Sequence, residues 1–114
     1  MRKVLVLSLL AGLLGALFVA APAFSKRKSV EIDDNYFVHE GKPPTVTVNR
    51  GDKVEWEWEG ASRHNVTVTK GPVKFHSKTQ SKGTFEKTLK TVGTYKIYCT
   101  IHSPDMRMTL KVVK

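Results

Sequence analysis

Short stretches in which apolar and polar residues alternate make up most of the chain after residue 29. The clearest lies at 53–58, where a valine and two tryptophans alternate with a lysine and two glutamates. Because successive side chains of a strand point to opposite faces, this pattern predicts a strand with one face in a core and the other in solvent. The same reasoning predicts further short strands at 30–32, 36–38, 45–48, 64–68, 85–89, 94–99 and 106–112.

Glycine, proline and aspartate separate these stretches, and no stretch repeats its apolar residues with the 3.6-residue period of a helix. The polar segment 70–83 carries a lysine at every fourth position, but Gly71 and Pro72 interrupt it. We therefore expect a solvated loop there and not a helix. The pattern as a whole predicts an all-β fold, a Greek-key antiparallel β-sandwich of about seven to eight strands.

The first 23 residues have the features of an export signal. Arg2 and Lys3 precede an uncharged apolar run at 4–21, and Ala21-Pro22-Ala23 offers the small residues at which a signal peptidase cuts. We therefore expect a signal peptide at 1–23 and one exported domain at 24–114, periplasmic or extracellular. The apolar run also reaches the lower length limit for crossing a bilayer, which leaves an uncleaved membrane anchor as the alternative.

The chain is strongly basic, with a formal net charge of +9. This balance favours partners with acidic surfaces. Nucleic acid is not expected as a partner, because no arginine-rich tract or aromatic stacking motif accompanies the lysines and an exported chain seldom meets it. Cys99 is the one cysteine of the sequence and has no disulfide partner within it, so a bound metal would explain its presence.

The segment from Cys99 to Met106 brings a thiol, an imidazole and a thioether into one tight loop between two predicted strands. Cys99 and Met106 lie at inward-facing strand ends, so this loop can turn both of them and His102 toward one point. His64, which begins another inward-facing strand, is the natural fourth donor. Two imidazoles, a thiolate and a weak axial thioether are the ligands of a blue-copper electron-transfer centre. Zinc is the weaker interpretation, because structural zinc has little use for methionine.

Other residues of the same types have simpler explanations. Met108 rivals Met106 as the axial ligand, but it would point deeper into the sandwich, so we expect it to pack in the core. His76, like His39, is interpreted as an ordinary partly buried histidine. A catalytic thiolate-imidazolium pair is disfavoured, because Cys99 would be sheltered and no third group would orient the imidazole. We therefore predict that the protein is not an enzyme.

The chain from about Val30 to Lys114 resembles the cupredoxin family of type 1 blue copper proteins. The resemblance includes the Cys-x-x-His-x-x-x-Met loop and five further stretches, which are Val46-Thr47-Val48, Gly51-Asp52, Val54 with Trp56, His64-Asn65-Val66 and Gly93-Thr94-Tyr95. It implies a Greek-key sandwich with one copper ion near one end. His64, Cys99 and His102 would bind the copper, and Met106 would be its axial ligand.

The same resemblance implies roles for two residues beyond copper binding itself. His102 would reach the surface and give electrons their way in and out, and Asn65 would tie the two ligand loops together and lend a backbone N–H to the cysteine sulfur. Two features depart from the family pattern. Three residues separate His102 from Met106, where family loops often have two or four, and Ile101 stands where many relatives have proline.

We therefore expect an exported blue-copper electron carrier that passes single electrons between redox partners through Cu(I) and Cu(II). Its partners would be redox proteins with acidic docking surfaces, and the protein itself would be a monomer without a membrane span in its mature form. The alternative is a copper carrier or storage protein, which would use similar ligands but deliver the ion instead of electrons. A rigid site on strands favours electron transfer, because delivery is typical of flexible tracts rich in methionine and histidine.

Overall fold

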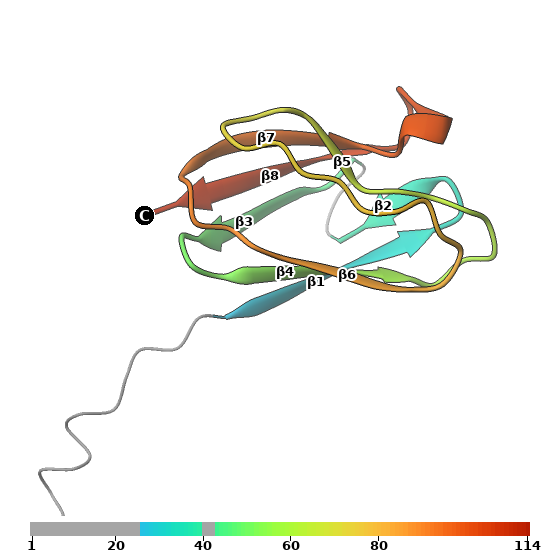
Figure 1. The fold of residues 1–114 in the computed structure, drawn as a ribbon, viewed down its shortest axis with the longest axis horizontal. Coiled ribbons are helices and arrows are strands. Elements are labelled where there is room, and N and C mark those ends of the chain that lie inside the picture. Colours follow the sequence, from blue (N-terminus) through green and yellow to red (C-terminus); the bar gives the residue numbers. More distant parts are fainter. Residues whose placement is uncertain (1–25, 40–42) are drawn as a thin grey trace, which may run out of the picture.

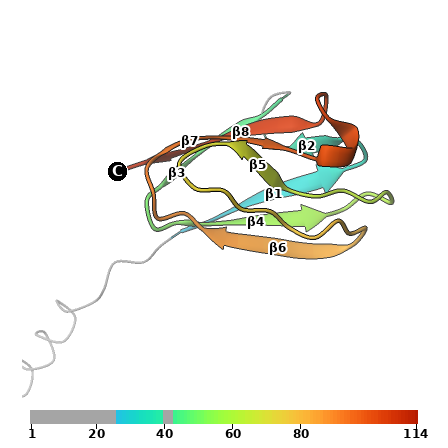
Figure 2. The same ribbon diagram turned by 45° about the horizontal axis from the view of Figure 1, so that its top comes forward.

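The computed structural model describes residues 26–39 and 43–114, which form a sandwich of two four-stranded sheets (Figures 1 and 2). The first sheet has the order β2-β1-β4-β6, made of Tyr36–Val38, Arg27–Asp33, Lys53–Trp58 and Gly83–Thr88. The second has the order β3-β8-β7-β5, made of Thr45–Asn49, Arg107–Val113, Gly93–Tyr98 and Thr67–Lys70. The prediction of an all-β sandwich with seven to eight strands is confirmed.

The sandwich is mixed in strand direction. Strand β1 is parallel to β4 and β3 is parallel to β8, whereas the other four pairs of the described strands are antiparallel. The chain leaves the first sheet after β2, adds β3 to the second and returns as β4, and these crossings between sheets set the two parallel pairs. Local alternation reports only which face of a strand is buried, so it predicts the strands but not their directions.

The segment 64–68 differs from the sequence-based expectation. Regular strand β5 begins only at Thr67, whereas His64 forms an isolated antiparallel bridge with Gln80. The His64 N–H donates to the Gln80 carbonyl at 2.9 Å, and the Gln80 N–H donates to the His64 carbonyl at 3.0 Å. The segment 71–82 contains bends and isolated bridges but no helix, as predicted, and its return path along β5 fixes the backbone of His64.

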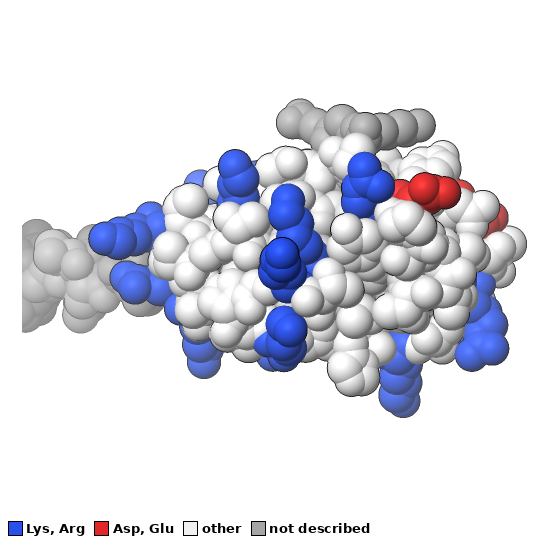
Figure 3. Space-filling model, turned by 90° about the horizontal axis from the view of Figure 1, so that it is seen from above, with Lys and Arg blue, Asp and Glu red and all other residues white. Residues whose placement is uncertain are grey.

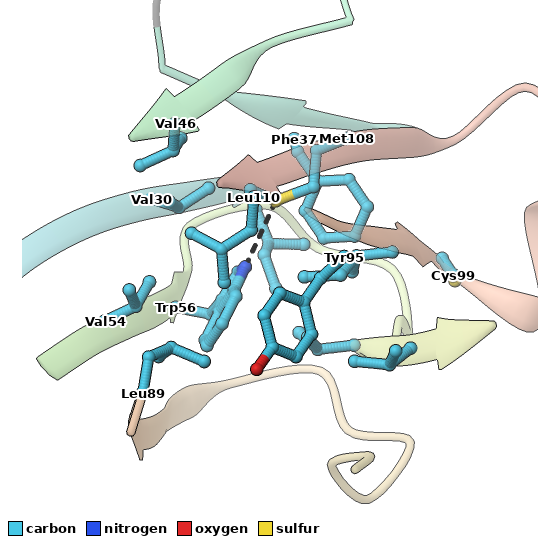
Figure 4. Packing of buried hydrophobic residues seen from close by; sticks show 14 of the residues in the cluster. Val30, Phe37, Val46, Val54, Trp56, Leu89, Tyr95, Cys99, Met108 and Leu110 are labelled. Atoms are coloured by element: carbon cyan, nitrogen blue, oxygen red, sulfur yellow. Dashed lines mark hydrogen bonds between the residues drawn. The ribbon is translucent and has the colours of Figure 1, made fainter. Parts of the chain in front are cut away.

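Side chains from the inner faces of both sheets form one core (Figure 4). Trp56 of β4 is fully buried, and its indole N–H donates to the Met108 sulfur of β8 at 3.3 Å, across the gap between the sheets. Met108 is therefore a core residue, as predicted. Cys99 lies at one end of this cluster in Figure 4, so the core extends to the residues of the predicted metal site.

A buried aspartate closes the end of the sandwich where β1 begins. The Asp52 carboxylate accepts the backbone N–H of Lys26 at 3.0 Å and that of Asn49 at 2.9 Å. These two bonds stabilise the charged form and hold the pKa of Asp52 below its ordinary value. Gly51, with φ of 97°, turns the chain between β3 and β4 in a conformation that glycine adopts without a steric penalty. The turn thus ties the start of β1 to the β3–β4 connection.

The expected signal peptide at 1–23 lies outside the described residues. Within the part of the chain that the structure describes, no helix is long and apolar enough to cross a membrane. The only helical element there is a single 3₁₀ turn, η2 at Thr100–His102, which stands at the end of the sandwich opposite the start of β1 (Figure 1).

Candidate metal centre

Three predicted ligands meet at the end of the sandwich that carries η2. His64 lies in the connection from β4 to β5, Cys99 directly follows β7, and His102 ends η2. The two imidazole Nδ1 atoms are 3.2 Å apart, and the Cys99 sulfur is 3.9 Å from Nδ1 of His64 and 3.5 Å from Nδ1 of His102. These three form the one cluster of metal-ligating side chains among the described residues, and His76 and His39 lie outside it.

The size of this triangle fits a metal ion. A point equally distant from the three donor atoms lies about 2 Å from each of them, close to the bonds of about 2.0–2.3 Å that imidazole nitrogen and thiolate sulfur make to a divalent ion such as zinc. Two nitrogens and a sulfur in a trigonal arrangement are the donor set of a blue-copper site. The three donor atoms are thus arranged for a soft or borderline metal.

His64 is fixed on every side. Its ring is fully buried, its carbonyl accepts the Trp58 indole N–H at 3.2 Å, and its Nε2 lies 3.4 Å from a carboxylate oxygen of Asp34. That same oxygen accepts the backbone N–H groups of Ala61 at 3.0 Å and Ser62 at 2.8 Å. Asp34 therefore shapes the loop that leads to His64 and faces the ring nitrogen that points away from the site, as carboxylates beside metal-bound histidines do.

The electrostatics of this contact favour a neutral imidazole next to a charged carboxylate. Burial lowers the pKa of His64, and its contact with Asp34 offsets part of that effect. The backbone N–H groups of Ser62 and Ala61 lower the pKa of Asp34. A neutral ring is the form that can bind a metal through Nδ1 while Nε2 donates to the carboxylate.

Asn65 joins the two ligand loops. Its backbone N–H donates to the Cys99 sulfur at 3.4 Å, its side-chain oxygen accepts the Thr100 N–H at 3.1 Å, and its side-chain nitrogen donates to the Thr100 hydroxyl at 2.9 Å. The role that the family resemblance implied for Asn65 is therefore found in the structure. A donor aimed at the sulfur stabilises the thiolate, which is the form that binds metal.

Met106 is the methionine next to the three clustered ligands. It is fully buried, its carbonyl accepts the Cys99 N–H at 3.0 Å, and its N–H donates to the His102 carbonyl at 3.1 Å. The sulfur of Met108, by contrast, is occupied by the Trp56 indole. Met106 is thus bound by its backbone to both ligands of its loop, which leaves it as the candidate for a fourth, axial donor.

Asp34 is a residue of the candidate site that the sequence analysis missed. It lies in the turn between β1 and β2, and its partners Ala61, Ser62 and His64 are 27 to 30 positions away along the chain. Gly60 is a sequence feature that fits this contact once the fold is known, because a Cβ atom at position 60 would come too close to the Asp34 side chain. Without the fold, neither residue could be connected with His64.

Comparisons with known proteins give the chain a family. Residues 26–113 match the copper binding proteins of the plastocyanin/azurin family. Plastocyanin from Synechococcus sp. is 30% identical over 112 residues, covering 88% of this chain and 82% of that protein. The crystal structure of amicyanin from Paracoccus versutus is 27% identical with a TM-score of 0.60, covering 82% of this chain and 86% of that one. Fold and site thus define a cupredoxin with a type 1 copper site.

The chain belongs to the plastocyanin/azurin family of copper binding proteins. The resemblance predicted from the Cys-x-x-His-x-x-x-Met loop is confirmed, and so is copper as the metal. A copper-containing nitrite reductase from Thermus scotoductus is also similar, with a TM-score of 0.66 and 22% identity over 83% of this chain and 24% of that one. Identity this low shows a shared fold alone.

Proposed function

We propose that the protein is an exported electron carrier that binds one copper ion through His64, Cys99 and His102, with Met106 as the axial ligand. When bound, copper supplies a one-electron couple between Cu(I) and Cu(II). The convergence of the three donor atoms at the end of a rigid sandwich carries this proposal. The similarity to plastocyanin and amicyanin supports it.

The protein's part in this function is to hold the ligands still. His64 is fixed by Asp34 and Gln80, and Cys99 is held by Asn65 and by the backbone of Met106. Ligands fixed in this way change their geometry little when one electron is gained or lost, because the residues that hold them are themselves part of the packed sandwich. A small rearrangement supports rapid electron exchange and disfavours release of the ion.

Exchange with a partner would take place at His102. His64 and Cys99 are fully buried, whereas His102 is partly exposed beside Ile101, whose side chain is 53% exposed. His102 is therefore the ligand through which a docked protein could come nearest to the metal. The buried surroundings of the other ligands keep water and small anions away from the ion.

A visible absorption spectrum tests this proposal. Cu(II) added to the purified protein should produce a strong thiolate-to-copper band, which should be absent from Cys99→Ala. The band should disappear on one-electron reduction and return on oxidation through several cycles without loss of copper. A protein that binds Cu(II) without such a band, or that loses the ion in each cycle, would contradict the electron-carrier function, and loss of the ion would instead favour copper delivery.

Export is tested separately by cell fractionation. The proposed signal peptide predicts that the protein accumulates outside the cytoplasm with its first residue near position 24. Mass spectrometry of the mature protein would locate the cleavage site. Recovery of the full chain in the membrane fraction would favour an uncleaved anchor, and recovery in the cytoplasm would contradict export.

A further inference from the structure

The outer faces of the two sheets differ in charge. The strands of the first sheet carry five carboxylates, and within the described residues every ion pair between a carboxylate and a lysine or arginine lies there. Arg27, for example, contacts Glu86 at 2.8 Å and Glu55 at 3.5 Å. The strands of the second sheet contain no acidic residue and four basic ones, which are Lys70, Lys96, Arg107 and Lys111.

Figure 3 views the molecule from the side of the second sheet. Blue side chains cross the middle of this face, and red ones are visible only near one edge. Cations that are paired with carboxylates attract a partner weakly, because the two charges cancel at a distance. In the part of the chain that the structure describes, the cations of the second sheet form no ion pair, so they should attract an acidic partner more strongly than the paired cations of the first sheet do.

A groove of about 470 Å³ lies on this face, and three of the four cations line it. Lys96 donates to the Thr109 hydroxyl at 3.2 Å, and Arg107 donates to the Pro104 carbonyl at 3.1 Å. These contacts with neutral oxygens position the two side chains, and neither cation has a carboxylate partner among the described residues. Lys70, the third cation, is on β5, which pairs with the edge of β7 that faces away from β8.

An irregularity in β5 brings its side chains into this groove. The pairing of β5 with β7 shifts register between Val68 and Lys70. In a regular strand Thr69 and Lys70 would point to opposite faces, but at this shift both are exposed and both line the groove. The bulge thus adds a cation and a hydroxyl to the same wall, and the Thr69 hydroxyl in turn donates to the Lys96 carbonyl at 3.2 Å.

We propose that this basic groove, formed by Lys70, Lys96 and Arg107, docks a carboxylate-rich segment of the redox partner protein. The proposal rests on the electron-carrier function and deepens it. Three cations without a carboxylate in the lining, together with hydroxyls and Tyr98, complement an acidic peptide segment in charge and in hydrogen bonding. A flat anionic membrane fits less well, because the three cations line a hollow and do not stand on a flat surface.

The groove is also in the right place for a carrier. Strand β7 leads directly into Cys99, and β8 starts directly after Met106, so two of the three strands that line the groove are connected by the ligand loop. A segment bound there would hold its parent protein beside the copper end. Docking on these strands therefore increases the time that the partner spends near the site, without any change at the ligands.

A hexaglutamate peptide is a suitable probe. Titrated into the ¹⁵N-labelled Cu(I) protein at low salt, it should shift the amide signals of the groove, chiefly those of Thr69, Lys96 and Thr109. The shifts should fade as salt rises, because exposed charges are screened. Absence of binding at low salt, or shifts confined to other surfaces, would overturn the proposal.

Two variants of equal charge separate the groove from the overall basic charge. Lys70→Gln/Lys96→Gln/Arg107→Gln should weaken peptide binding by roughly tenfold, because each exposed pair contributes modestly. The matched control changes three exposed lysines that do not line the groove, Lys74→Gln/Lys82→Gln/Lys90→Gln, and should weaken binding by less than about twofold. Equal weakening by both variants would overturn the proposal in favour of a diffuse charge effect.

Two further measurements keep the interpretation clear. Vesicles of phosphatidylglycerol test a membrane as the alternative occupant. If they bind through the same groove and the peptide does not bind, the proposed protein segment is wrong and the groove binds a membrane.

The visible absorption of the copper-loaded groove variant should match that of the unaltered protein. A missing copper band in both proteins would mean failure of the electron-carrier function, whereas an intact band with no peptide binding would mean failure of the docking groove alone.

Discussion

The two ends of β1 are held by the same device, an aspartate that accepts two backbone N–H groups. At the far end from the metal centre, Asp52 binds the N–H of Lys26 immediately before β1 and that of Asn49 at the end of β3. At the metal end, Asp34 immediately after β1 binds two N–H groups of the loop at 61–62. Each aspartate thus fastens β1 to a distant turn of the chain.

The difference lies in what else the carboxylate contacts. Among the described residues, the Asp52 carboxylate accepts hydrogen bonds from backbone N–H groups alone, whereas the Asp34 oxygen also lies 3.4 Å from His64 Nε2. Asp52 therefore stabilises the fold alone, whereas Asp34 both stabilises the fold and orients the imidazole of His64. Substitutions at the two ends should accordingly separate stability from copper binding.

The largest effect is expected from removal of an imidazole at the metal end. Either His64→Gly or His102→Gly should abolish the thiolate-to-copper band, since each removes one of three clustered donors. The two variants should differ when free imidazole is added. Imidazole should restore the band in His102→Gly, whose cavity is open to solvent, but not in His64→Gly, whose cavity is closed.

Far-ultraviolet circular dichroism should confirm that both glycine variants remain folded, because the far end of the sandwich is untouched. Equal recovery of the band in the two variants would mean that the burial of His64 does not limit access. It would also weaken the distinction between a fixed ligand and an exchangeable one.

The next effect separates the core from the site through two methionines. Met108→Ala should reduce the free energy of unfolding by about 2–5 kcal/mol, as expected for a buried large-to-small change, and should retain a copper band. Met106→Ala should retain copper but shift the absorption and raise or lower the reduction potential, because the axial ligand tunes both. Urea unfolding of the copper-free proteins and spectroelectrochemistry of the loaded ones provide the measurements. An unchanged potential in Met106→Ala would exclude it as a ligand.

Much of this arrangement could be predicted from the sequence, because its signals are local. Strand β4 at 53–58 follows from strict alternation, and the loop from Cys99 to Met106 carries three donors within eight residues. The core position of Met108 follows from its period-two relation to Met106. Local patterns of this kind need no knowledge of which strands are neighbours.

The parts that could not be predicted depend on contacts between distant segments. His64 is held by Gln80 and by Asp34, and neither position carries a motif that points to position 64. Strand direction is set by crossings between the sheets, so the two parallel pairs were not foreseen. The register shift between Val68 and Lys70 depends in the same way on its partner strand β7. Long-range pairing, and not the choice of strands, limited the prediction.

A smaller effect tests whether Asp34 orients His64. Asp34→Ala should lower copper affinity by about 10- to 100-fold, as is typical when the carboxylate partner of a metal-bound histidine is removed. Asp105→Ala is the matched control, because Asp105 is exposed in the ligand loop and makes no side-chain contact with a ligand in the described residues. Competition with a Cu(I) chelator measures both affinities. A similar loss in both variants would indicate a general effect of negative charge near the site.

The smallest effect concerns Asp52 at the far end. Its pKa in the folded protein lies below the ordinary value of 3.8, so the folded state binds a proton less readily than the unfolded state does. The stabilisation is complete above that ordinary value and is lost as the pH falls through the lowered pKa. Urea unfolding of the copper-free protein should therefore show a declining free energy below about pH 4, and the decline should be shallower in Asp52→Asn than in the exposed control Asp105→Asn. Equal declines in the two variants would mean that other carboxylates, Asp34 first among them, cause the loss in acid.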